Sequence, residues 1–153
     1  HYFKGNKKGD VEALNDYGLK RPSWRSDLEV LYPDCKQALK TLHQHYKIGI
    51  IANQLPNLQA RLGRFGIDSW IDLVISSADV GLAKPDLAIF ELALQQANCL
   101  AEGAVMIGDR LDNDILPAKQ LGMQTIWIRQ GFSRLTHITN PAEAPDWTVD
   151  NLT

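Results

Sequence analysis

The sequence predicts an α/β domain whose strands form a mostly parallel β-sheet. Short apolar runs rich in β-branched residues alternate along the chain with stretches in which apolar residues recur at helical spacing. This alternation is typical of right-handed βαβ units, which build parallel sheets. The length of 153 residues, with 44% hydrophobic and 22% charged residues, is that of one main globular domain with a sizeable core.

The polar beginning of the chain differs from the rest. Residues 1–33 are irregular and contain several glycines and prolines, with a short helix expected around residues 10–17. The pattern then sharpens, because apolar residues keep helical spacing over 34–46 and the run KIGIIA at 47–52 predicts a buried strand. We therefore expect the main domain over residues 34–153.

Two further helices and two further strands are expected in the middle of the chain. Leucines and a phenylalanine at helical spacing predict a helix over residues 58–65, which Gly66 ends. The apolar run DLVIS predicts a strand at 72–76, and DLAIFELALQQA predicts an amphipathic helix at 86–97. The run AVMI predicts a strand at 104–107.

The last third of the chain continues the alternation. A short helix is expected over residues 114–122, with Pro117 in its first turn, where the missing N–H costs little. The run MQTIWI predicts a strand at 123–128, and WTV predicts a last short strand at 147–149.

Charge and composition exclude several classes of function. The net charge of −2 and the pI of about 6.1 give no electrostatic reason to expect nucleic acid or an anionic membrane as partner. No apolar run approaches the roughly 20 residues that span a bilayer, and two distant cysteines form no CxxC pair. The motifs of P-loops, dinucleotide-binding turns, serine hydrolases and zinc proteases are absent. A reducing cytoplasm is the expected location.

Polar side chains follow three of the expected strands. Asn53 follows the strand at 47–52, Lys84 lies in the segment after the strand at 72–76, and Asp109 follows the strand at 104–107. Ligands of parallel sheets bind beyond the carboxyl ends of the strands. These three groups are therefore expected on one rim of the sheet, and they are the candidate site.

The aspartates of the stretch VMIGDRLDND are candidate metal ligands. Mg²⁺ takes oxygen ligands from one or two carboxylates and leaves room for water and a substrate phosphate. Asp109 and Asp114 fit this role, the second directly or through water, because Gly108 leaves the approach to the strand end open. Asp112, or alternatively Asn113, is instead expected to cap the helix that begins at 114.

Lys84 and Asn53 are the candidate anion-binding groups. Lys84 precedes Pro85, which favours an extended backbone, and a lysine held there could neutralise a phosphoryl group or a carboxylate pair. The alternative is an ordinary solvated lysine. The amide of Asn53 could donate to an anion, or it could hold a loop.

The order and spacing of these segments resemble those of the haloacid dehalogenase (HAD) superfamily. The matching pieces are YKIGIIANQ, ISSADVGLAKPDLAIFELAL and VMIGDRLDNDILPAKQLGMQTIWIRQG, and GLAKPD followed by IGDRLDND is the most specific part. The chain looks most like phosphatase-type members whose cap is inserted early in the chain. The resemblance implies a Rossmannoid three-layer fold, with residues 1–33 as a remnant of a helical cap and its linker.

The resemblance also implies a reaction and assigns roles. Lys84 would steady the nucleophile and the phosphoryl group, Asp109 would bind Mg²⁺, and Asp114 would support the metal site. Family members form an aspartyl-phosphate intermediate and then hydrolyse it. The expected substrate is a small phosphorylated molecule. Phosphonate and carbon–halogen substrates stay open, with a phosphate ester favoured.

Two departures from the family pattern limit this assignment. Ala52 stands where the family has a serine or threonine that binds the phosphoryl group, so that role would pass to Asn53 or to backbone N–H groups. The chain also has no DxDx[TV] motif, which carries the family's nucleophile. We therefore expect the chain to start after the nucleophile and to be inactive alone. The alternative is a HAD-like binding or regulatory module that has lost catalysis.

The missing nucleophile strand predicts a slot in the sheet. In the family this strand lies between the strands that correspond here to 47–52 and 104–107, both of which read as fully buried. A strand from an upstream segment, or from a second copy by strand exchange, is expected to fill the slot, since unpaired buried backbone groups are costly. The alternative is that the two strands pair directly and close it.

Overall fold

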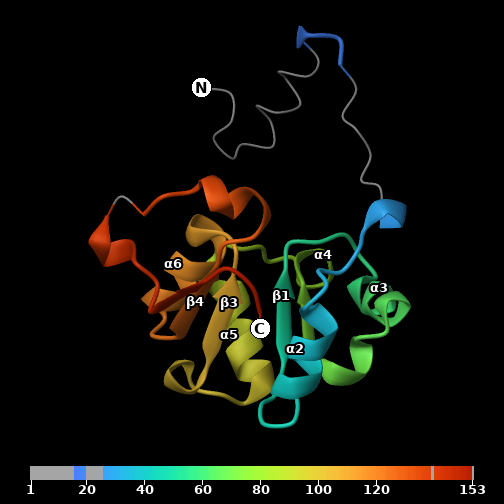
Figure 1. The fold of residues 1–153 in the computed structure, drawn as a ribbon, viewed down its shortest axis with the longest axis horizontal. Coiled ribbons are helices and arrows are strands. Elements are labelled where there is room, and N and C mark those ends of the chain that lie inside the picture. Colours follow the sequence, from blue (N-terminus) through green and yellow to red (C-terminus); the bar gives the residue numbers. More distant parts are fainter. Residues whose placement is uncertain (1–15, 20–25, 139, 153) are drawn as a thin grey trace. The chain divides into compact units, whose positions relative to one another are not determined.

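The computed structural model describes residues 16–19, 26–138 and 140–152 (Figure 1). The chain divides into two compact units, residues 1–30 and residues 31–153. The described part of the first unit includes the 3-10 helix η1 (Ser26–Leu28). The helix expected around 10–17 falls almost entirely outside the described residues, and the cap remnant stays a prediction.

The second unit contains the predicted alternation of strands and helices. Its main elements are α2 (Cys35–Leu42), β1 (Gly49–Ala52), α3 (Leu58–Phe65), β2 (Leu73–Ser76), α4 (Ser77–Val80), α5 (Leu87–Ala97), β3 (Val105–Gly108), the π-helical turn η4 (Leu111–Ile115), α6 (Leu116–Gln120), β4 (Gln124–Ile128) and β5 (Trp147–Val149). The five expected strands are all present, and each lies within two residues of its expected bounds. The short helix α4 and the π-helical turn were not predicted.

The strands form two parallel sheets, which confirms the α/β class. β1 pairs with β2, and β3–β4–β5 form the second sheet in that order. Two helix ends lie where the sequence signals them, whereas α2 ends at Leu42, before the end of the predicted helical spacing at residue 46. The carboxylate of Asp86 accepts from the N–H of Ala88 at 3.0 Å and caps α5. Gly66 ends α3 with a φ of 65°, in the left-handed region that favours glycine.

Helices cover both faces of the β1–β2 sheet. Ile51 and Ile75 belong to the core that α5 completes on one face. Ile50 and Val74 face the other way and pack against the core around Leu58 of α3. The side chains therefore alternate between two helical layers, and this half of the molecule has the expected three-layer arrangement (Figure 1).

The β3–β4–β5 sheet is covered on one face and exposed on the other. Met106, Thr125 and Trp127 are buried. Met106 belongs to the core that α5 and α6 complete. On the opposite face Val105 is 48% exposed and Ile107 39% exposed. The prediction that the strand at 104–107 is fully buried is therefore wrong. The same prediction for the strand at 47–52 is also wrong, because in β1 Gly49 is exposed and the other three residues are only half-buried.

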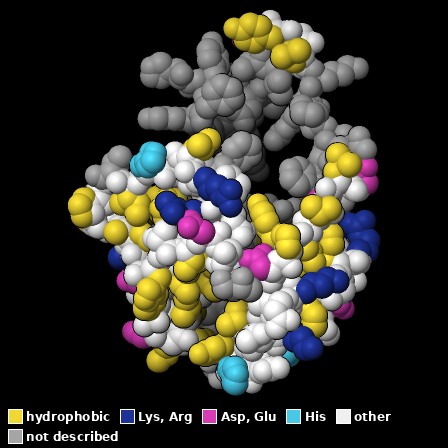
Figure 2. Space-filling model, in the orientation of Figure 1, with side chains coloured by type: hydrophobic (Ala, Val, Ile, Leu, Met, Phe, Trp, Pro, Cys, Tyr) yellow, Lys and Arg dark blue, Asp and Glu magenta, His cyan; other side chains and the backbone are white. Residues whose placement is uncertain are grey.

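The exposed face of this sheet is apolar. Register places Ile107 of β3 beside Ile126 of β4, and Ile126 beside Trp147 of β5, which is 51% exposed. Figure 2 shows hydrophobic side chains on the molecular surface in this region. Parallel strands are ordinarily covered on both faces, so this face differs from the ordinary pattern.

β1 and β3 do not pair with each other. Within residues 26–138 and 140–152, β1 is hydrogen-bonded to β2 and β3 to β4, and no ladder joins the two sheets. The alternative in which these strands close the slot by direct pairing is therefore not what the structure has. Each of the two strands keeps one free edge on the side where a strand between them was predicted.

Candidate active site at the carboxyl ends of the strands

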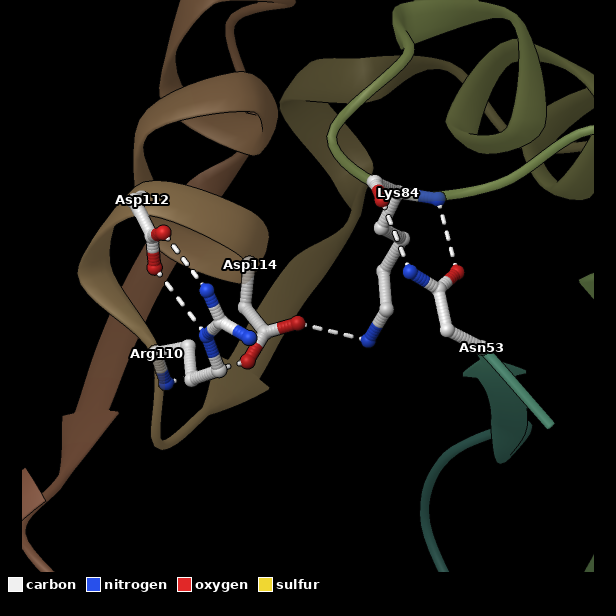
Figure 3. A network of polar contacts seen from close by, with 5 residues as sticks. All are labelled: Asn53, Lys84, Arg110, Asp112 and Asp114. Carbon is white, nitrogen blue, oxygen red and sulfur yellow. Dashed lines mark hydrogen bonds and ion pairs between the residues drawn. The ribbon is translucent and has the colours of Figure 1, made fainter. Parts of the chain in front are cut away.

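The four predicted site residues follow the strands as expected. Asn53 follows β1, Lys84 lies in the loop between α4 and α5, and Asp109 and Asp114 lie after β3. Figure 3 shows Asn53, Lys84 and Asp114 as consecutive members of one polar network.

The side-chain amide of Asn53 holds the backbone of Lys84. Its Nδ2 donates to the Lys84 carbonyl oxygen at 2.7 Å, and its Oδ1 accepts from the Lys84 N–H at 2.8 Å. The loop-holding alternative for this residue is therefore realised in the structure. The Lys84–Pro85 peptide bond is cis.

Lys84 is not a solvated surface lysine. Its Nζ lies 2.5 Å from Oδ1 of Asp114, and the two side chains are only 10% and 6% exposed. A buried ion pair of this kind concentrates one positive and one negative charge in a region that water reaches poorly. The ammonium is thus fixed at the rim of the sheet.

Asp114 is held over the end of β3 by the turn that follows. The turn η4 starts after Arg110, whose N–H donates to Oδ2 of Asp114 at 3.0 Å. Asp114 also packs directly on Gly108, because a Cβ at that position would lie only 2.7 Å from its Cγ. Gly108 therefore makes room for Asp114, whereas the sequence predicts that it leaves the approach to the strand end open for Asp109.

Asp109 has a fixed backbone and an exposed side chain. Its carbonyl oxygen accepts from Nε1 of Trp127 at 2.9 Å, and Trp127 is 3% exposed. The tryptophan is a core residue, as expected, and it also anchors the strand end that carries Asp109. The Asp109 carboxylate remains accessible to a ligand.

Arg110 and Asp112 form an exposed pair beside the site. Nε and Nη2 of Arg110 donate to the two carboxylate oxygens of Asp112 at 3.1 and 2.6 Å. These bonds lower the pKa of Asp112 below its ordinary value and raise the pKa of Arg110. The N-cap residues are Arg110 for η4 and Ile115 for α6, so Asp112 does not occupy the predicted capping position.

Gln54 and Ser77 are two further polar residues at the rim that the sequence analysis does not select. The N–H of Gln54 donates to Oγ of Ser77 at 3.1 Å, and its side-chain Oε1 accepts from Nη1 of Arg61 at 2.9 Å. These bonds fix the loop after β1. The available signal was the serine pair at the end of β2, where Ser76 ends the strand and Ser77 begins α4. Ala52 packs in the core near α3 and offers no hydroxyl.

The carboxylates fit a hard cation in number and chemistry. Asp109 and Asp114 supply two anionic oxygen donors at one strand end, which is the usual protein contribution to a Mg²⁺ site. One Asp114 oxygen is engaged by Lys84 and the other by a backbone N–H. Over the described residues, no group of three or more metal-binding side chains is assembled.

An open pocket lies beside Asp109. It has a volume of about 360 Å³. The residues that line it are Tyr32, Ile107, Gly108, Asp109, Ile128, Gln130 and Leu152. Leu152 enters from the end of the described chain, where its N–H donates to Oδ2 of Asp34 at 2.7 Å. The pocket therefore combines one carboxylate with apolar walls on the open side of β3.

Comparison with known sequences identifies related enzymes. The family model described as haloacid dehalogenase-like hydrolase matches residues 7–128. The pyrimidine 5′-nucleotidase YjjG of Escherichia coli is 37% identical over 123 residues, covering 78% of this chain and 52% of that protein. A glyceraldehyde 3-phosphate phosphatase of Methanocaldococcus jannaschii is 44% identical over 107 residues, covering 69% and 46%. The chain thus spans about half the length of the curated relatives it matches.

Solved structures share the fold. A HAD phosphatase from Thermococcus onnurineus matches with a TM-score of 0.73 and 25% identity, over 93% of this chain and 66% of that one. The HAD-hydrolase YfnB from Bacillus subtilis, solved bound to magnesium, matches with a TM-score of 0.78 and 20% identity, over 95% and 67%. At that identity, the second likeness concerns the fold alone.

Proposed function

The chain belongs to the haloacid dehalogenase-like hydrolase family, and we propose that it forms most of the core of a Mg²⁺-dependent phosphohydrolase acting on a small phosphate ester. The observation that carries the proposal is the buried pair of Lys84 with Asp114 at the rim where Asp109 is exposed. Positive charge held in a poorly solvated site is the kind of group that stabilises a phosphoryl group in transfer.

In this proposal the residues of the rim have different roles. Lys84 neutralises charge on the transferred phosphoryl group, and Asp109 with Asp114 would hold Mg²⁺. The ion would supply further positive charge to the phosphate oxygens. Asn53 and the loop after β1 keep these groups in place.

The nucleophile is the part of the reaction that we assign to a segment outside residues 1–153. We propose that an aspartate arrives on a strand between β1 and β3, forms an aspartyl-phosphate and is then regenerated by hydrolysis. The unpaired facing edges of these two strands support this proposal. We call this chain together with that segment the completed protein.

A non-catalytic module is the second candidate. Two observations favour it: Ala52 has no hydroxyl for a phosphoryl group, and the amide of Asn53 is engaged by Lys84. In this alternative the fold keeps a ligand-binding rim without turnover. The whole protein's substrate and its cytoplasmic location are predictions in either case. Among the described residues, no helix has the length and hydrophobicity that crossing a membrane requires.

The test is phosphate release by the completed protein from a generic phosphate ester, with Mg²⁺ and with a chelator. We expect Mg²⁺-dependent turnover that Lys84→Ala lowers by about 100- to 1,000-fold in kcat. Lys36→Ala, on the exposed side of α2, is the matched control and should leave the rate unchanged. Residues 1–153 alone should be inactive. Turnover by residues 1–153 would overturn the assignment of the nucleophile, and an inert completed protein would favour the binding module.

A further inference from the structure

The side chain of Asn53 is committed to one partner. Its carbonyl oxygen and an N–H of its amide bind the backbone of Lys84 at 2.8 and 2.7 Å, so a closed pair of hydrogen bonds joins the two residues (Figure 3). A phosphate-binding asparagine would instead direct its N–H groups at the ligand, and one of them is already used here.

The loop that carries Lys84 has few other ways to fix its backbone. The next residue is Pro85, which has no N–H to donate. Within the loop, the N–H of Asp86 donates to the Ala83 carbonyl at 3.0 Å and closes a turn around Lys84 and Pro85, and the side chain of Asp86 caps α5. Asn53 therefore provides the anchor on the side of β1.

The same contacts connect the two sheets at the rim. β1 and β3 share no ladder within the described residues, yet Asn53 after β1 binds Lys84, and Lys84 binds Asp114 after β3. The position of the Lys84 ammonium is thus set from both sides. A reacting group between β1 and β3 would therefore meet the ammonium of a lysine whose backbone is held by Asn53.

We infer that Asn53 is a positioning residue that acts through Lys84, and that it does not itself bind the phosphoryl group. The inference builds on the proposed function, because it assigns the means by which Lys84 is held ready for the reaction. It replaces the direct phosphate-binding role that the sequence predicts for Asn53.

A double-mutant cycle in the completed protein tests the inference. We expect Asn53→Ala to lower kcat by on the order of 100-fold with little change in KM, because a misplaced catalytic group costs rate rather than ground-state binding. In a Lys84→Met background the same change should add no more than about twofold, since the two residues act as one unit. Gln59→Ala, an exposed amide on α3, is the control and should leave both constants unchanged.

A second measurement needs no turnover. In residues 1–153, the rate at which an amine-acylating reagent modifies Lys84, read by peptide mass spectrometry, should rise about fivefold in Asn53→Ala, the ratio for a lost contact of ~1 kcal/mol. The exposed Lys40 of α2 is the internal standard. If Asn53→Ala does not fold, Asn53→Asp replaces it, because the carboxylate still accepts from the Lys84 N–H but cannot donate to its carbonyl.

The outcomes separate the two proposals. A large further loss from Asn53→Ala in the Lys84→Met background, or a raised KM with unchanged kcat, would overturn the positioning role and make Asn53 a substrate ligand. Unchanged acylation of Lys84 would overturn it as well. If Lys84→Met leaves kcat unchanged while Asn53→Ala accelerates the acylation of Lys84, the positioning of Lys84 by Asn53 is supported. That result would contradict the proposed function instead.

Discussion

Asp114 packs directly on Gly108, the last residue of β3. A Cβ at residue 108 would lie 2.7 Å from both Cγ and Oδ2 of Asp114, well inside van der Waals contact. The carboxylate can therefore lie over the strand end, within reach of Lys84, only because residue 108 has no side chain. The buried ion pair depends on this missing methyl group.

Gly108→Ala should consequently displace Asp114 and weaken its pair with Lys84. We expect a loss of about 1–3 kcal/mol in the free energy of unfolding, measured by urea titration, as for other overpacked positions. Gly103→Ala is the matched control, because a Cβ there would meet Sγ of Cys99 at an ordinary 3.5 Å. Equal stability of both variants would mean that Asp114 can move without cost.

Breaking the buried pair should cost more than breaking the exposed one. Lys84→Met leaves Asp114 buried without its partner, and the loss of unfolding free energy should be about 3–5 kcal/mol. Arg110→Ala breaks the pair with Asp112, whose side chains are 59% and 71% exposed, and should cost no more than about 1 kcal/mol. Similar costs for the two variants would contradict the burial of the Lys84–Asp114 pair.

The strands and most helices followed from the sequence because local patterns determine them. Apolar runs fixed the strands, and Gly66 and Asp86 marked helix ends that the structure confirms. The π-helical turn before α6 was not predicted, because no apolar period in the sequence signals it. Within it the N–H of Ile115 donates to the Arg110 carbonyl at 3.2 Å, and its residue Asp114 also binds Lys84, 30 residues earlier in the chain.

The sequence selects the candidate site residues but not their contacts. Topology places the ends of parallel strands on one rim, so Asn53, Lys84, Asp109 and Asp114 could be selected from the sequence. Hydrogen-bond partners depend on side-chain directions that periodicity does not contain. The burial of β3 was overestimated for a related reason: an apolar run indicates that a strand can be covered on both faces, and Val105 and Ile107 are nevertheless exposed.

Metal binding should depend on Asp109 and not on Asp112. In the completed protein, Asp109→Asn should abolish the Mg²⁺ binding heat in calorimetry, because an anionic ligand becomes neutral. Asp112→Asn is the matched control. The carboxylate of Asp112 is occupied by Arg110, so the Mg²⁺ affinity of this variant should equal that of the wild type. Unchanged affinity in Asp109→Asn would remove that residue from the metal site.

Asp146 should make the fold sensitive to acid. Its carboxylate accepts from the N–H and the Oγ1 of Thr125, both at 2.8 Å, and these bonds lower the pKa of Asp146. Because the folded-state pKa lies below the unfolded value of about 3.9, the contribution is present above that pH and is lost as the pH falls through the folded pKa. The difference in melting temperature between wild type and Asp146→Asn should therefore shrink as the pH is lowered from about 6 to about 3.

Thr125→Val provides the matched variant for this pH dependence. It keeps the shape of the buried side chain and the bond from the Thr125 N–H to the carboxylate. It removes the bond that the hydroxyl donates to the Asp146 carboxylate and the one that it accepts from the Asp146 N–H at 3.1 Å. The acid sensitivity should become smaller without disappearing. A constant difference between wild type and Asp146→Asn over the whole pH range would show that the carboxylate charge contributes nothing to the fold.

The free edges of β1 and β3 should become protected when the proposed strand lies between them. Hydrogen–deuterium exchange of their amides should slow by at least about tenfold in the completed protein relative to residues 1–153, because groups that open to water would become paired. The amides of β4 are the internal control, since β4 already lies between β3 and β5 in both proteins. A strand exchanged from a second copy would instead protect β3 in residues 1–153 as their concentration rises. Equal exchange of β3 under all these conditions would mean that no strand enters the slot, and the nucleophile would then have to reach Lys84 by another route.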